Sequence, residues 1–166
     1  MTLLDILTVE EWAKIEEELG SRTNLSPAVF NAEGGRITDS AFPCNRLCTA
    51  LRKVPKAAAQ VCALAHQNMA QMAKNSHKPV VEECDAGMVK IVVPIFTGDE
   101  FIGAIGGCGR LLPDSQVEVE YLAEISGLPA EEIRSLASGV GTITEDEARA
   151  LADGMAEQVQ KILGGS

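Results

Sequence analysis

The chain has 166 residues, and with 46% hydrophobic and 23% charged residues its composition is that of a folded globular protein. Its formal net charge of −10 argues against unaided binding to nucleic acid, because a phosphate backbone requires a basic surface. The N-terminal segment MTLLDILTVEEW has neither the basic start of a secretory signal nor the long apolar run of a membrane anchor. We therefore expect a single domain over residues 1–166, in the cytoplasm, with no membrane or direct nucleic-acid partner.

The first predicted elements are a helix and a hairpin. Residues 8–19 combine an N-cap residue, Thr8, with Glu11 three positions later and apolar residues at helical spacing, which predicts an amphipathic helix that ends before a glycine. Two short apolar stretches, 27–31 and 36–38, flank a Glu-Gly-Gly turn and predict a β-hairpin.

The middle and C-terminal parts alternate between helical and strand patterns. Apolar residues recur at intervals of three and four over 55–74, which predicts a long helix that begins at a proline. Three strands joined by short turns follow, at residues 80–84, 88–96 and 100–109, and then three helices, at residues 115–126, 129–138 and 144–163. This order predicts an α+β fold, in which an antiparallel sheet has helices inserted between its strands and helices at both ends.

The main candidate site consists of cysteines. If the segment around Cys44 begins a helix, Cys44 and Cys48 share one face of it, and Cys62 and His66 share a face of the next helix, because residues four apart lie on one side. Such faces, together with Cys84, can converge on one ion or cluster. The cytoplasm is reducing, so these thiols are expected as free groups or ligands and not as disulfides.

Four thiolates hold an iron-sulfur cluster, and four thiolates or three with an imidazole hold zinc. The preferred metal ligands are Cys44, Cys48, Cys62 and Cys84, and an iron-sulfur cluster, possibly of the 4Fe-4S type, is the first-choice cofactor. Zinc, or no metal at all, is the alternative, since buried cysteines often serve only as small apolar side chains. Three further residues are candidates for contact with a cofactor in the same pocket: Cys108, His66 and Glu83.

Several segments resemble the PocR sensory domain, a family with a PAS-like fold. The most specific are Cys-Asp-Ala-Gly at 84–87 and Val-Pro-Ile at 93–95, and the likeness runs from about residue 12 to about residue 163. The resemblance implies a sensor that binds small organic molecules such as diols and hydrocarbon derivatives and signals to an output domain of a bacterial regulator. The chain departs from the usual pattern by the extra thiol of the Cys44 and Cys48 pair and by Cys108, where relatives often place Gly-Gln.

The sequence therefore predicts a bacterial sensory domain with a cysteine-lined pocket that acts as a redox or oxygen sensor through an iron-sulfur cluster or other metal. The alternatives are a sensor for a small organic molecule and a thiol redox switch. The expected partners are the small molecule or cluster, a signalling output protein and a second copy of the chain. We expect no enzymatic activity, because only Cys62 with His66 offers a nearby nucleophile and base and no catalytic motif accompanies them.

Overall fold

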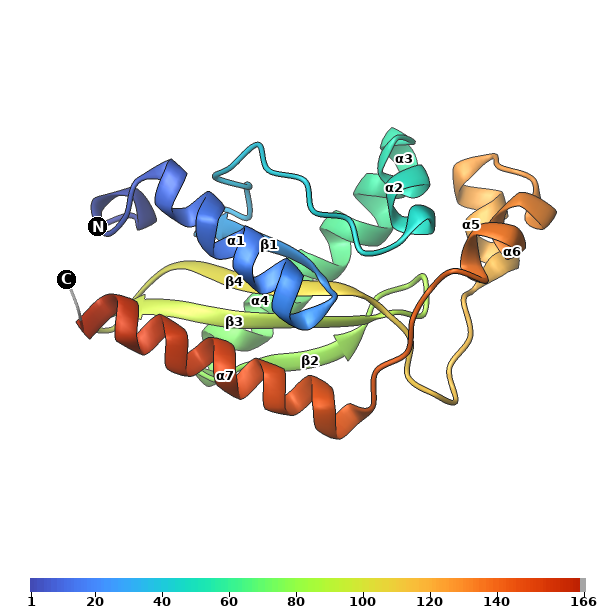
Figure 1. The fold of residues 1–166 in the computed structure, drawn as a ribbon. Coiled ribbons are helices and arrows are strands. Elements are labelled where there is room, and N and C mark those ends of the chain that lie inside the picture. The colour runs from blue at the N-terminus through green and yellow to red at the C-terminus, as the bar shows by residue number, and fades with distance from the viewer. Residues whose placement is uncertain (165–166) are drawn as a thin grey trace.

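The computed structural model describes residues 1–164, and its centre is a four-stranded antiparallel sheet (Figure 1). The strands lie in the order β1-β4-β3-β2, so the three consecutive C-terminal strands form a meander and the first strand pairs with the last. This arrangement confirms the predicted α+β fold. The strand bounds are β1 (Ser26–Asn31), β2 (Val80–Glu83), β3 (Val89–Thr97) and β4 (Glu100–Arg110).

Helices cover both faces of the sheet. Helices α1 and α7 pack on one face, α4 packs on the other, and α5 and α6 lie at one end beside α2 (Figure 1). No helix within residues 1–164 is long and apolar enough to cross a membrane. The helical bounds are η1 (Leu3–Asp5), α1 (Val9–Thr23), α2 (Arg46–Arg52), α3 (Pro55–Ala57), η2 (Ala58–Ala63), α4 (Leu64–Ser76), α5 (Val119–Ser126), α6 (Ala130–Ala137) and α7 (Glu145–Gly164).

The first helix begins as predicted but ends later. The Thr8 hydroxyl accepts the backbone N–H of Glu11, and the Glu11 carboxylate accepts the N–H of Thr8, so two donors at the start of the helix that would otherwise be free are satisfied. The prediction that the helix stops before Gly20 is wrong. Gly20 lies inside α1, next to Pro27, and the helix ends instead at Asn24, which adopts the left-handed conformation.

The predicted hairpin is reduced to one arm and a turn. Asn31 closes the turn, because its side-chain oxygen accepts the N–H groups of Glu33 and Gly35. The strand predicted at residues 36–38 is wrong, since only the single bridge between Phe30 and Arg36 forms there. The chain then leaves the sheet, and the Arg36 guanidinium is turned toward α1.

The helical stretch predicted over residues 55–74 is present but is not one continuous α-helix. It consists of α3, a π-helical segment over Ala58–Ala63 and α4. A π-helical turn accommodates an extra residue, and such turns occur often at functional sites. The periodicity of small apolar residues did not reveal this change, because alanines fit an α-helix and a π-helix equally well. The first of the three C-terminal helices also begins later than predicted, at Val119, after a loop in which the Glu118 N–H binds the Ala86 carbonyl.

Alternation along the strands gives the sheet two different faces. Ile91, Val93 and Ile95 of β3 point into the core beneath α1 and α7, whereas Val92 points into the cluster beneath α4. Lys90 shares the orientation of Val92. The second face therefore carries a lysine within a strand that is otherwise apolar.

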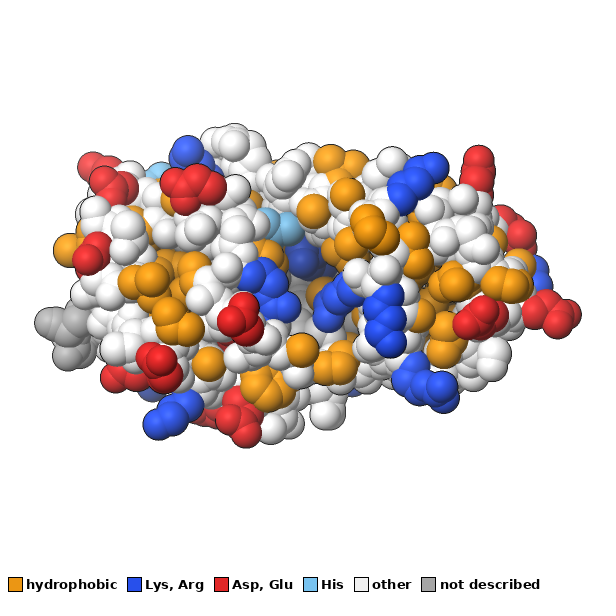
Figure 2. All heavy atoms as spheres, turned by 90° about the horizontal axis from the view of Figure 1, so that it is seen from above, with side chains coloured by type: hydrophobic (Ala, Val, Ile, Leu, Met, Phe, Trp, Pro, Cys, Tyr) orange, Lys and Arg blue, Asp and Glu red, His pale blue; other side chains and the backbone are white. Residues whose placement is uncertain are grey.

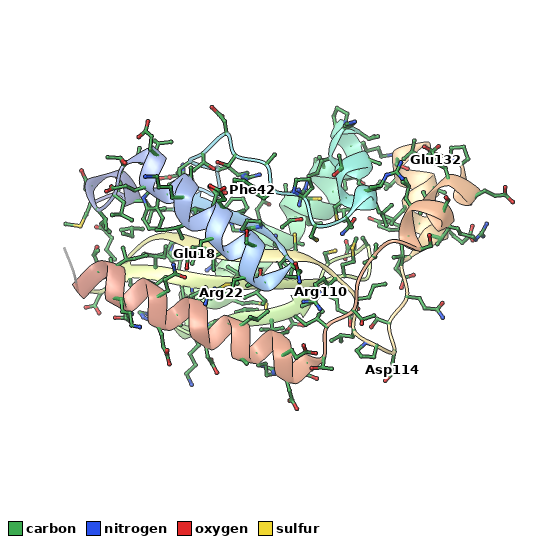
Figure 3. All side chains as sticks on the ribbon, viewed as in Figure 1. Glu18, Arg22, Phe42, Arg110, Asp114 and Glu132 are labelled. Carbon is green, nitrogen blue, oxygen red and sulfur yellow. The ribbon has the colours of Figure 1, made fainter. Side chains whose placement is uncertain are left out.

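Arg110, at the end of β4, connects the sheet to both helices of the first face. Its guanidinium donates to the backbone carbonyl of Thr23 at the end of α1, at 3.0 Å, and to the carbonyl of Thr142 before α7. Figure 3 shows Arg110 between these two helices. Arg22 of α1 adds a further contact with Gln158 of α7, at 3.2 Å.

Glycine at position 106 is a steric requirement of the sheet. A Cβ there would overlap the carbonyl oxygen of Ile91 on the neighbouring strand.

Gly106→Ala should therefore lower the free energy of unfolding by about 3 kcal/mol, because the β3 to β4 pairing must shift. Gly154→Ala is the matched control: Gly154 lies in α7, and a Cβ added there would have no neighbouring atom within 4 Å, so alanine should raise stability by about 0.5–1 kcal/mol. Urea unfolding of the two variants checks both values, and equal effects would contradict the strand argument.

Candidate ligand-binding cavity

A cavity of about 320 Å³ lies between the second face of the sheet and the helical segments α2, η2 and α4. Strands β1, β3 and β4 form its floor, with Ala28, Val92 and Gly106 facing inward. Figure 2 looks onto this side of the molecule and shows a hollow with lysine or arginine side chains and a histidine at its edge and in its depth. The cavity therefore opens to the surface, although most of its wall is apolar.

Four of the five cysteines line this cavity, each from a different part of the fold. Cys108 lies on β4, Cys48 on α2, Cys62 on the π-helical segment and Cys84 in the turn after β2. All five cysteines of the chain are free thiols. The structure thus brings together three of the four predicted metal ligands, and it places Cys108 with them.

Cys44 lies outside the cavity wall, because the helix begins after it. Asn45 caps α2, its side-chain oxygen accepting the Cys48 N–H at 2.7 Å, so Cys44 and Cys48 do not share a helical face as predicted. The Cys44 sulfur instead contacts the carbonyl oxygens of Cys108 and Gly109, each at 3.4 Å. Cys44 fixes the loop to the end of β4.

Asn45 was not singled out in the sequence, yet it positions the cavity wall. Its amide nitrogen donates to the Gly109 carbonyl at 2.7 Å and lies 3.4 Å from the Cys48 sulfur, while its oxygen caps α2. One buried side chain therefore joins the start of α2 to the end of β4. An asparagine before a short helical stretch is an N-cap signal that would have identified it.

Glu83 also lies outside the cavity. Its side chain is exposed, and its carboxylate accepts the Ser115 hydroxyl at 3.3 Å. Side chains alternate between the two faces of the sheet along this stretch. Cys84, in the turn after β2, therefore faces the cavity, whereas its neighbour Glu83 lies in solvent.

Burial favours the protonated form of three of the cavity thiols. Burial raises the pKa of Cys48 to about 12, and it also raises the pKa values of Cys62 and Cys84. Cys108 is their common neighbour, because a negative charge on its sulfur would raise the pKa of each of these three thiols further. Any metal bound here must displace protons from these groups.

His66 lies in α4 and is 3% exposed. Its ring stacks on Phe30, with 3.6 Å between ring centroids, and its Nδ1 atom has no hydrogen-bond partner in the part of the chain that the structure describes. Burial, with a smaller contribution from the positive charge of Lys90, lowers the pKa of His66 to about 4. The imidazole is therefore neutral at pH 7.

Three basic residues that were not expected from the sequence also line the cavity. Lys90 projects from β3, and Arg52, at the end of α2, donates to the Cys108 sulfur at 3.7 Å. Arg36 contributes from the loop after β1. A lysine inside the apolar run of a predicted buried strand is the signal that would have revealed the first of these.

Arg36 is held in place by a buried acid of α1. Its guanidinium donates to the Glu16 carboxylate at 2.9 Å and to the Ser40 carbonyl at 2.9 Å, and the Thr38 hydroxyl donates to the same carboxylate. Burial raises the pKa of Glu16, and these hydrogen bonds and the arginine charge oppose the shift. Within residues 1–164, Arg36 is the one of these three basic residues whose charge is matched by a carboxylate.

The four cavity thiols do not form a site for a single metal ion. Within residues 1–164, no three side chains of His, Cys, Asp or Glu lie close enough together to hold one metal ion. The ligands of an iron-sulfur cluster, in contrast, bind different iron atoms. Cys48, Cys62, Cys84 and Cys108 would be the residues that hold such a cluster, which would supply one-electron chemistry.

The neutral state of buried His66 makes stability depend on pH. The unfolded chain binds a proton at this residue with a pKa near 6.5, whereas the folded chain does so only near 4, so stability falls as the pH is lowered between these values. Replacing His66 with glutamine (His66→Gln) removes this pH-dependent contribution to the free energy of unfolding. Relative to the variant, the wild type should lose about 3 kcal/mol of unfolding free energy between pH 7 and pH 4. Urea unfolding across that range measures the difference, and parallel curves for the two proteins would contradict it.

Comparison with known families agrees with this geometry. The family profile described as the sensory domain found in PocR matches residues 5–165. No curated protein and no solved structure matches the chain significantly. The profile covers nearly the whole chain, including every wall of the cavity, and the chain therefore belongs to the PocR sensory-domain family.

Proposed function

We propose that this sensory domain detects a small organic molecule that binds in the cavity between the sheet and α2, η2 and α4. The observation that carries this proposal is the cavity itself. It has a volume of about 320 Å³ and is lined by residues of the sheet and of the helical segments α2, η2 and α4. Ligand pockets in proteins begin at about this size, with mostly apolar walls and a few polar groups that fix orientation. A metabolite with on the order of ten heavy atoms suits the space.

The position of the cavity also provides a route for a signal. Its walls belong to the sheet on one side and to three separate helical segments on the other, including the π-helical turn that carries Cys62. A ligand that binds better to one packing of these elements shifts the population toward it. The change in packing is what an output protein would detect.

Filling the cavity should abolish ligand binding without unfolding the domain. Ala28 lies on β1 and faces the cavity, so Ala28→Leu places extra side-chain volume there, whereas Ala32→Leu adds the same volume at an exposed position beyond the strand. A panel of short-chain alcohols, diols and carboxylates should raise the Tm of the wild type and of Ala32→Leu, but not of Ala28→Leu. Equal shifts in all three proteins would place the binding site elsewhere, and no shift in any would contradict the proposal.

A second candidate, an iron-sulfur sensor, is supported by the convergence of four thiols on the same space. Cys48, Cys62, Cys84 and Cys108 provide the thiolates that such a cluster needs, with Cys108 in the role that the sequence analysis gave to Cys44. The positive charges of Arg52 and Lys90 near Cys62 would favour its thiolate form. The raised pKa values of Cys48, Cys62 and Cys84 oppose the same step.

Anaerobic purification distinguishes the two candidates. A cluster predicts brown protein with about four iron and four sulfide per chain. Cys108→Ser should then lose most of the iron, whereas Cys44→Ser, which alters a thiol outside the cavity wall, should retain it. Colourless wild-type protein without iron would reject the cluster and leave the organic ligand.

A further inference from the structure

The charge of the cavity is opposite to that of the protein. The chain has a net charge of −10, yet no Asp or Glu lines the cavity within the described residues 1–164, whereas Arg36, Arg52 and Lys90 do. The charge of Arg36 is matched by Glu16. The remaining two positive charges define the chemistry of the space.

Lys90 lies deep in the wall. Its side chain is on the cavity face of β3, opposite Cys108 of β4, and the residue is 8% exposed. Its ammonium group lies 5.8 Å from the centre of the Phe30 ring. Over residues 1–164 it forms no side-chain hydrogen bond and no ion pair, so its charge has no anionic partner in this part of the chain.

Burying an unpaired charge is among the most unfavourable arrangements in a folded protein. Its neighbours Val89, Ile91 and Val92 are all buried and apolar, and a methionine would fit the same strand with no loss of apolar contact. Lysine at this position is therefore expected to be less favourable for the stability of the sheet than methionine. A negatively charged occupant of the cavity would remove that penalty.

Arg52 supports the same conclusion from the opposite wall. Its guanidinium contacts the sulfur of Cys108 at 3.7 Å, and no carboxylate in the described chain pairs with it. The charges of Arg52 and Lys90 both act on the thiol of Cys62, which places the two cations around the same part of the cavity. A planar guanidinium and an ammonium together are well suited to a carboxylate.

His66 supplies a neutral donor beside them. Phe30 contacts both residues, since the imidazole stacks on its ring and the Lys90 ammonium lies over it. The Nδ1 atom of His66 is buried and has no partner in residues 1–164, although buried polar atoms are nearly always hydrogen-bonded. A turn of the imidazole ring, which lines the cavity, would present this atom to an oxygen atom of a bound molecule.

We propose that the molecule detected by this domain is a small organic carboxylate, whose head group binds Lys90 and Arg52 with His66 as a further hydrogen-bond donor. Its apolar part lies against Leu51 and Val61, which line the same cavity. This inference rests on the proposed function, because it assigns a ligand class to the same cavity. A neutral diol would leave the charge of Lys90 without an anionic partner. An iron-sulfur cluster held by thiolates would supply that negative charge in place of a carboxylate.

Calorimetric titration with matched probes tests the assignment. The carboxylates from propanoate to octanoate are compared with the 1-alcohols and 1,2-diols of equal chain length, on the wild type, Lys90→Met, Arg52→Gln and Lys78→Met. Lys78 is exposed in the loop after α4 and provides a control for loss of a positive charge alone. At least one carboxylate should bind the wild type and Lys78→Met at least about tenfold more tightly than its alcohol and diol.

The preference for the carboxylate should nearly disappear in Lys90→Met and fall in Arg52→Gln. Without ligand, the Tm of Lys90→Met should exceed that of the wild type, which shows that the lysine does not serve the fold. Equal or tighter binding of the alcohol or diol overturns the carboxylate assignment and leaves the proposed function intact. An undiminished preference of Lys90→Met for the carboxylate has the same consequence. If no probe of any class binds, both proposals fail, and iron with sulfide in the wild type then assigns the positive charges to a cluster.

Discussion

The alternation of side chains along β3 and β4 is the constraint on which the rest of the molecule depends. Ile91 and Val93 enter the core beneath α1 and α7, while Lys90 and its cross-strand neighbour Cys108 face the cavity. A shift of one residue in register would exchange the two sets and place a charge in the apolar core. The close approach of β3 to Gly106 fixes that register. The same pairing therefore determines both the stability of the sheet and the chemistry of the cavity.

The walls of the cavity are held by a small number of buried polar contacts. Asn45 joins the start of α2 to the end of β4, and Glu16 holds Arg36 against α1. In each of these contacts the polar groups form hydrogen bonds with each other. They therefore hold the edges of the cavity in place without a ligand. Within residues 1–164, the polar groups left without a partner include the Lys90 ammonium and the Nδ1 atom of His66, and both residues line the cavity, which supports the proposed binding site.

The sequence was sufficient for the elements and for the family, but only partly for the site. Strand alternation and helix caps predicted the meander and most helices, and the motif around Cys84 led to the correct family. Local spacing was a poor guide to Cys44, because it lies one residue before the N-cap of α2 and not on the helix. Lys90 was missed for a different reason: periodicity identifies which face a residue occupies, but not whether a partner from another element neutralises its charge.

The most direct test of the central claim is a crystal structure of the wild-type protein grown from anaerobically purified material in the presence of the tightest-binding carboxylate, with diffraction also measured at the iron absorption edge. We expect density for one organic molecule in the cavity, with its carboxylate at the ammonium of Lys90 and the guanidinium of Arg52, and no anomalous signal from iron. A cavity that contains only water, or an iron signal bonded to Cys48, Cys62, Cys84 and Cys108, would contradict it.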